Sequence, residues 1–234
     1  MGPDASCEQL CAAANRIIVS CSNISEVDGG LVAVDCETTY ACGTGRRPTE
    51  LVRASVDGDV VGRWLAEAAQ LEAASVPAFE IVARELRAHD APAALIARAL
   101  ESADDERRHA RIMTSLARAH GATPGPVRVI VREPRDLEAI ARENVVEGLV
   151  REAYGARVAI DPAIAADELR HAELAAFVHD WIRPRLPYAA RRRVDEARAA
   201  ARAQLVADCA VEPAPALRHA LPDATRAVEL AHLI

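Results

Sequence analysis

The sequence predicts an all-α protein built around a four-helix bundle with one long crossover. Alanine fills about a fifth of the 234 positions, aromatic residues supply only 3%, and β-branched runs are short, so helices are favoured over sheets. From residue 60 onward apolar residues recur at helical spacing, and a stretch rich in proline and glycine at 122–134 separates two pairs of such segments. Two helical hairpins joined by a crossover are typical of a four-helix bundle.

The two hairpins are expected to place four helices side by side. A short break at 89–92 joins the first pair, and short connections make neighbouring helices antiparallel. Pro77 lies inside the first helix and should kink it by removing one amide donor. Asp161 and Pro162 are an N-cap and a first helical residue, so the last helix starts there. The expected helices cover 60–88, 92–120, 135–154 and 161–182.

The chain is expected to have a turn-rich N-terminal segment at 1–59, the bundle at 60–183 and a C-terminal helical extension at 184–234. Cys209 lies in the extension, and the other cysteines crowd the N-terminal segment. Such crowding favours a disulfide framework made in an oxidising, extracytoplasmic compartment, with a structural metal site as the alternative. No secretory signal follows Met1, so a chain that truly starts there would stay in the cytoplasm. The crowded cysteines are Cys7, Cys11, Cys21, Cys36 and Cys42.

Charge and hydropathy exclude two classes of partner. The formal net charge of −7 argues against a nucleic-acid-binding protein. No stretch approaches the roughly 18 to 20 uncharged apolar residues that a membrane span needs. The GTGRRP segment at 43–48 is too short for a phosphate-binding loop and lacks the strand and helix that flank one.

The chemistry is expected at two copies of one motif. Residues 105–109 read DERRH and residues 167–171 read DELRH, and alanine follows each copy. With 20 glutamates and 7 histidines, chance should give about 0.6 Glu-x-x-His pairs in the chain. Requiring the aspartate and arginine as well lowers that expectation to roughly 0.005. The repetition therefore indicates a shared function.

The spacing of the motif suits a metal site. Residues i and i+3 lie on one face of a helix, so Glu106 and His109 can present a carboxylate and an imidazole to one point, as can the matching pair of the second copy. That donor set favours iron or manganese over a closed zinc site. Glu72 precedes Glu106 by 34 residues with the turn at the midpoint, so both glutamates should lie at the same height. The residues of the second copy are Glu168 and His171.

The second hairpin leaves a choice of glutamate. Glu143 and Glu147 precede Glu168 by 25 and 21 residues, and both midpoints fall in the region where a turn is plausible. We favour Glu147 as the metal ligand and expect Glu143 to be a second ligand or a catalytic partner beside the metal. Tyr154 lies two turns after Glu147 on the same face; an ordinary core tyrosine is the preferred interpretation, and a redox-active catalytic residue is the alternative.

The two DExRH motifs, each preceded by a helix glutamate, resemble the ferritin-like di-iron carboxylate superfamily over about residues 60–183. The segments LEAASVPAFE, DERRHA, ENVVEG and DELRHA are also similar to a group of bacterial ferritin-like proteins. The resemblance implies two metal ions about 3.5 to 4 Å apart inside a four-helix bundle. It further implies that Asp105 orients His171 and that Asp167 orients His109. The implied ligands are Glu72, Glu106 and His109 for one ion and Glu147, Glu168 and His171 for the other.

The function expected from this resemblance is that of a di-iron oxidoreductase. Two iron ions, or manganese, or a mixed pair, would activate O2 to oxidise a small substrate that the sequence does not identify, with an electron donor as a further partner and a homodimer as a candidate assembly. The alternative is a non-catalytic iron-binding or iron-handling protein of the ferroxidase type. The N-terminal segment and the C-terminal extension argue against a closed cage because both would crowd its packing surfaces.

Overall fold

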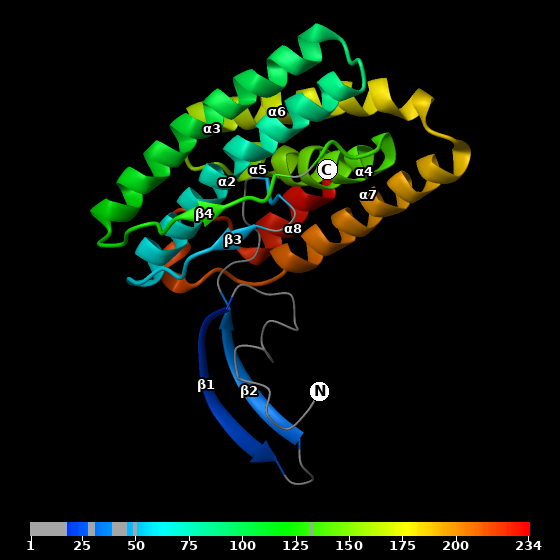
Figure 1. Cartoon of the computed structure of the whole chain (residues 1–234). Coiled ribbons are helices and arrows are strands. Elements are labelled where there is room, and N and C mark those ends of the chain that lie inside the picture. The colour runs from blue at the N-terminus through cyan, green and yellow to red at the C-terminus, as the bar shows by residue number, and fades with distance from the viewer. Residues whose placement is uncertain (1–17, 28–30, 39–45, 49–50, 132) are drawn as a thin grey trace.

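A computed structural model shows a helical body that begins with two long helices (Figure 1). The structure describes residues 18–27, 31–38, 46–48, 51–131 and 133–234. Helix α2 covers Val60–Ala88 and α3 covers Ala93–Ala119, and the two pack along their length as an antiparallel hairpin. Asp59 caps α2 by accepting a hydrogen bond from the backbone N–H of Gly62, and the helix continues through Pro77. Both helices lie where the apolar spacing predicts them.

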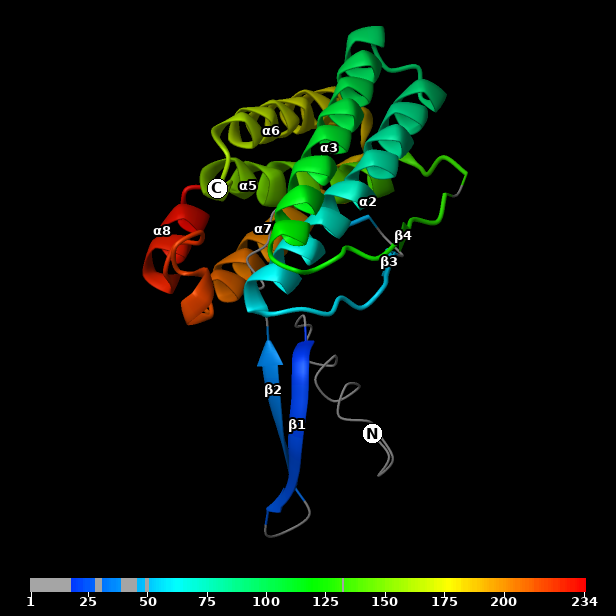
Figure 2. The same ribbon diagram turned by 90° about the vertical axis from the view of Figure 1, so that its left-hand side faces the viewer.

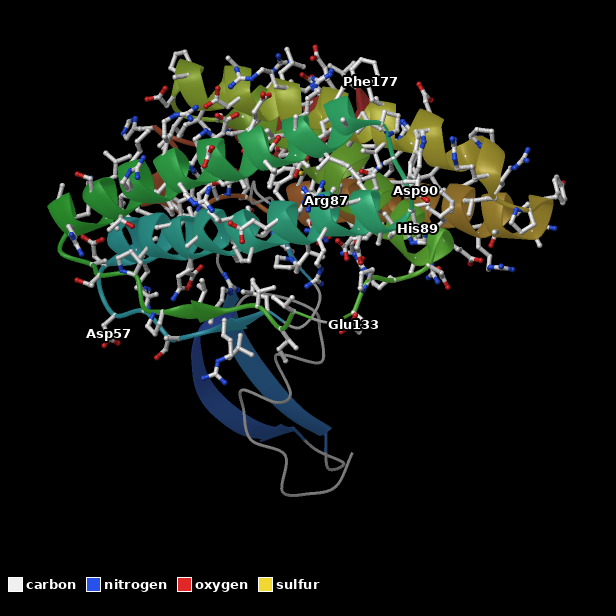
Figure 3. The ribbon with its side chains drawn as sticks, turned by 45° about the horizontal axis from the view of Figure 1, so that its top comes forward. Asp57, Arg87, His89, Asp90, Glu133 and Phe177 are labelled. Atoms are coloured by element: carbon white, nitrogen blue, oxygen red, sulfur yellow. The ribbon has the colours of Figure 1, made fainter. Side chains whose placement is uncertain are left out.

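The connection between α2 and α3 is tight. His89 ends α2, and Asp90 has a positive φ of 55°, the left-handed conformation that reverses the chain. A ring nitrogen of His89 lies 2.7 Å from the carbonyl oxygen of Arg135, which ties this turn to the segment before the next helix. Figure 3 shows His89 and Asp90 at this turn.

The second pair begins with one helical run that contains a π-helix. Helix α4 (Leu137–Glu143) passes into the π-helix η1 (Asn144–Glu152) and then into α5 (Ala153–Val158). Helix α6 follows at Pro162–Ile182, capped by Asp161 as the sequence predicts. It packs against η1, α5 and α3. The sequence predicts the existence of both helices but not the π-helical segment between α4 and α5.

The C-terminal residues add helices that pack on the second pair (Figure 1). After the short 3-10 helix η2 (Arg183–Arg185), α7 (Tyr188–Cys209) contacts η1 and α4. A further 3-10 helix, η3 (Pro215–Leu217), leads to α8 (Ala224–His232), which packs on α7. The main core is shared by the long helices and α7. It includes Phe79, Leu86, Ala99, Ile140, Val145, Leu174, Val178, Ile182 and Val194.

Two small antiparallel sheets accompany the helices. Strands β1 (Ile18–Val27) and β2 (Leu31–Thr38) form a hairpin that projects from the helical body, as Figures 1 and 2 show. Strands β3 (Val52–Arg53) and β4 (Val127–Arg128) pair beside α2, so the predicted crossover contains a short extended element. Cys209 is buried and disulfide-bonded. The other five cysteines lie outside the residues whose side chains are described, so the expected disulfide framework stays a prediction.

Among the residues that the structure describes, none of the helices combines the length and the apolar character needed to cross a bilayer. The prediction of an all-α fold is confirmed for the helical body.

Gly148 allows η1 and α6 to approach closely. A Cβ atom at this position would lie 2.3 Å from the Cβ of Ala175, well inside contact distance. The amide of Asn144 reinforces the contact by donating a hydrogen bond of 2.8 Å to the carbonyl oxygen of Ala175.

We expect Gly148→Ala to lower the free energy of unfolding by about 1–3 kcal/mol, because the added methyl group forces the two helices apart. Thermal unfolding should show a Tm lower by roughly 2–10 °C. Ser115→Ala, an exposed position on α3, should change stability by less than about 0.5 kcal/mol. Equal stability of the two variants would contradict the close packing at Gly148.

Candidate metal centre

A group of buried acidic and imidazole side chains lies inside the helical body. Glu72 comes from α2, Glu106 and His109 from α3, and Glu168 and His171 from α6. None of the five is more than 3% exposed. These helices bring together all the sequence-predicted ligands except Glu147.

Four of these residues converge on one point. Glu72, Glu106, His109 and Glu168 each offer one ligand atom, and the four atoms lie within 4.8 Å of one another. The Nδ1 atom of His109 lies 3.5 Å from Glu106 Oε2, 3.7 Å from Glu72 Oε2 and 3.9 Å from Glu168 Oε1. A single cation placed among these atoms would have three carboxylates and one imidazole as ligands, a donor set that suits iron or manganese.

His171 approaches the same glutamates from the other side. Its Nδ1 atom lies 3.4 Å from Glu106 Oε1 and 4.0 Å from Glu168 Oε2. The two imidazole rings are 6.0 Å apart between centroids. Glu106 and Glu168 therefore direct one carboxylate oxygen toward each histidine.

The ligand atoms lack the partners that buried polar groups normally have. Within the described residues, no hydrogen-bond donor reaches either carboxylate oxygen of Glu106 or of Glu168. Oε2 of Glu72 also lacks a donor there. The Nδ1 atoms of His109 and His171 are likewise without a hydrogen-bond partner. Leaving a buried carboxylate uncompensated costs several kcal/mol. Unpartnered donor atoms of these types fit a bound metal ion.

Burial and the mutual repulsion of these carboxylates change their pKa values. Burial raises the pKa of Glu106 well above its usual value, and the charge of Glu72 raises it further. Burial and the charges of Glu106 and Glu72 raise the pKa of Glu168 in the same way. Burial opposes the charged form of His109, but Glu72 and Asp167 outweigh it and raise the pKa of His109 to about 8. Without a metal ion, protons take over part of the neutralisation that a cation would supply.

Each histidine is held by the aspartate of the opposite motif. His109 Nε2 lies 2.9 Å from Asp167 Oδ2, and His171 Nε2 lies 3.4 Å from Asp105 Oδ2. Although burial opposes ionisation, the histidines and neighbouring arginines hold the pKa of both aspartates below the usual range. An ionised aspartate can only accept, so Nε2 carries the hydrogen and Nδ1 faces the glutamates. The crossed pairing is the one that the resemblance implies.

The arginines of the two motifs join the aspartates into a ring. Arg108 lies 2.7 Å from an oxygen of Asp105 and 2.7 Å from an oxygen of Asp167. Arg170 likewise contacts both aspartates, at 3.0 Å from Asp105 Oδ2. Both arginines are about half exposed, at 47% and 52% of the side chain. The ring stands between the histidines and solvent and fixes the aspartates that orient them.

The glutamates predicted for the second hairpin lie outside this group. Glu147 accepts a hydrogen bond of 2.8 Å from the backbone N–H of Arg47, and its other oxygen is 3.4 Å from Arg151 Nε. Glu143 lies 2.5 Å from Arg135 Nη1. Both carboxylates are therefore engaged by arginine residues and not by the histidine cluster.

Tyr154 is fully buried in a second apolar cluster with Val150, Leu205 and Cys209. This cluster contains residues of η1, α5 and α7. The surroundings are those of the core tyrosine that we prefer from the sequence.

Glu152 is a buried carboxylate that the sequence reasoning missed. It lies at the end of η1, is fully buried, and its charge raises the pKa of both Glu106 and Glu168. A π-helix has a longer hydrogen-bonded repeat than an α-helix, so side chains late in η1 point elsewhere than regular helical spacing predicts. The sequence contained one signal: the midpoint between Glu152 and Glu168 is residue 160, and the α5–α6 turn occupies residues 159–161.

Arg46 from the N-terminal segment is paired with Glu152. Its Nε lies 2.9 Å from Glu152 Oε1, and the two side chains are 2% and 0% exposed. The guanidinium carbon lies 4.6 Å above the Phe79 ring, and that ring is 4.9 Å from the ring of His171. The backbone N–H of Arg46 donates a hydrogen bond of 3.1 Å to Ser75 Oγ. Burial opposes the charge of Arg46, but Glu152 outweighs it and raises the pKa of the guanidinium.

Comparisons of the chain with family models, with curated proteins and with solved structures found no match. The case for a metal centre therefore depends on the geometry of the side chains.

The raised pKa values predict that the metal-free chain loses stability as pH rises and that a bound metal ion stabilises it more at higher pH. A group whose pKa is higher in the folded state contributes stability below its unfolded pKa and loses it as pH rises. For His109 this window runs from about 6.5 to about 8, and Glu106 and Glu168 act with the same sign. We expect the Tm of the EDTA-treated chain to fall between pH 6.5 and pH 8.5.

Over the same interval Mn²⁺ should raise the Tm by an increasing amount, because the ion replaces protons. The affinity should rise about tenfold per pH unit for each proton released. A metal-free Tm that rises with pH across this range would contradict the assigned protonation.

We expect Asp167→Asn to lower the affinity for Mn²⁺ by about 10- to 100-fold, because His109 loses the charge that orients it. Isothermal titration calorimetry of the folded variant would measure this. Asp104→Asn is a matched control on α3 because Asp104 pairs only at the surface with Arg107. Similar losses in both variants would argue against an orienting role of Asp167.

Proposed function

We propose that this chain is a ferritin-like, non-haem di-iron oxidoreductase that activates O2 to oxidise a bound small substrate. The observation that supports the proposal is the convergence of unpartnered carboxylate oxygens and Nδ1 atoms at one buried point. Manganese or a mixed pair of ions is compatible with the same donors. An electron donor and a homodimeric assembly belong to the proposal as partners.

The ligands divide into two sets that share two glutamates. Glu72 and His109 would hold one ion, and His171 and Glu152 the other. Glu106 and Glu168 would contribute to both sets, since each lies near both histidines. In this proposal Glu152 takes the place that the sequence prediction gives to Glu147.

The residues of the chain prepare the centre for redox chemistry. Bound iron would supply the electrons for the reduction of O2. Asp105 and Asp167 keep the hydrogen of each imidazole on Nε2 and leave Nδ1 available. The raised pKa values of Glu106 and Glu168 allow these carboxylates to hold protons that leave when a cation enters. The side chains of all six proposed ligands are buried, which excludes bulk water from the centre.

We expect Glu168→Gln to lose most of the bound iron, because Glu168 would contact both ions, whereas Glu147→Gln should keep the wild-type content. Both variants would be loaded anaerobically with Fe²⁺, and iron per chain would be measured by elemental analysis. O2 uptake after reduction should follow iron content across the three proteins. Iron that is retained by the wild type without O2 uptake would favour the iron-handling alternative, and a wild type that binds no iron would contradict both functions.

A further inference from the structure

The Arg46–Glu152 ion pair engages one of the proposed ligands of the second ion, Glu152. Four buried glutamates lie close enough to influence one another's charge: Glu72, Glu106, Glu152 and Glu168. Arg46 is bound to Glu152 and supplies one full positive charge to this interior. It does not come from the helices that supply the histidines, but from residues 46–48, which lie against α2 and η1 through Ser75 and Glu147.

The ligand sets differ in how ready they are for a cation. The set of Glu72, Glu106, His109 and Glu168 is already convergent and has no arginine among its hydrogen-bond partners in the described residues. The set around His171 needs Glu152 as an additional carboxylate, and Arg46 holds Oε1 of that carboxylate at 2.9 Å. The other oxygen of Glu152, Oε2, has no hydrogen-bond partner in the described part of the chain.

We propose that Arg46 determines how many ions the centre binds tightly, by retaining Glu152 and so weakening the second position. The inference rests on the proposed function, because it assumes that the cluster binds metal. An ion that draws Glu152 away leaves the Arg46 guanidinium buried without its carboxylate. Breaking a buried ion pair in this way is strongly unfavourable, so the second ion binds at least about 100-fold more weakly than the first.

The charges favour the same order of loading. With the four glutamates ionised, Arg46 leaves a net charge of −3, and one divalent cation reduces it to −1. A second divalent cation brings the interior to +1 while Arg46 remains, so it gains no neutralisation. If Arg46 were uncharged, two divalent cations would balance the four carboxylates, and both positions would fill readily.

The packing around Arg46 holds it in place. Its side chain lies over the Phe79 ring, and its Nη2 atom comes close to Gly148, where a Cβ atom would be in van der Waals contact with it at 3.4 Å. The Phe79 ring in turn contacts His171. Arg46 thus reaches the second ligand set through defined contacts, as expected of a positioning residue.

The experiment counts Mn²⁺ ions bound under anaerobic conditions, with free Mn²⁺ measured by electron paramagnetic resonance. The wild type should bind one ion tightly and a second about 100-fold or more weakly. Arg46→Met should bind two ions with affinities within about tenfold of each other, and Arg46→Lys, which keeps the charge, should resemble the wild type. Arg47→Met is the matched control on the same segment and should also resemble the wild type.

A folded Arg46→Met chain that keeps the wild-type pattern would overturn the inference, as would a wild type that binds two ions equally well. If Arg46→Met fails to fold, Glu152→Gln decides: it should lose the weak second ion and keep the first, and retention of both ions would overturn the inference. Wild-type chain that binds no Mn²⁺ would instead overturn the metal centre itself.

Discussion

The burial of Glu72, Glu106, Glu152 and Glu168 within one helical body is the constraint on which the rest of the site depends. Carboxylates away from water require protons, cations or hydrogen-bond donors, and the described residues supply too few donors for Glu106 and Glu168. The molecule contains three responses to this deficit. Glu106 has a raised pKa and so holds a proton more readily. Arg46 neutralises Glu152, and Glu72 stabilises the positive charge of His109. A metal ion among Glu72, Glu106, His109 and Glu168 would take over the role of the protons.

The sequence allowed the part of the site that follows from local geometry to be predicted. Glu106 with His109 and Glu168 with His171 share a helix face because their spacing is i, i+3 on regular helices. Glu72 could be found because α2 and α3 are long, regular and joined by a short turn. The bounds of these helices follow from caps and apolar periodicity.

Two features could not be predicted in this way. The π-helix η1 changes which residues face the interior, so the assumption of 3.6 residues per turn does not reveal that Glu152 is fully buried. The position of Arg46 results from the docking of an irregular segment on α2 and η1, which no periodicity in the sequence reports. A fixed turn position at residues 159–161 would have drawn attention to Glu152 but not to Arg46.

The ring of Asp105, Arg108, Asp167 and Arg170 makes the two halves of the centre thermodynamically interdependent. Each aspartate serves the histidine of the opposite helix, and each arginine serves both aspartates. A substitution on α3 therefore changes the surroundings of the imidazole on α6, and the reverse also holds. Free-energy changes from substitutions in the two motifs cannot simply be added, although the motifs are about sixty positions apart in the chain.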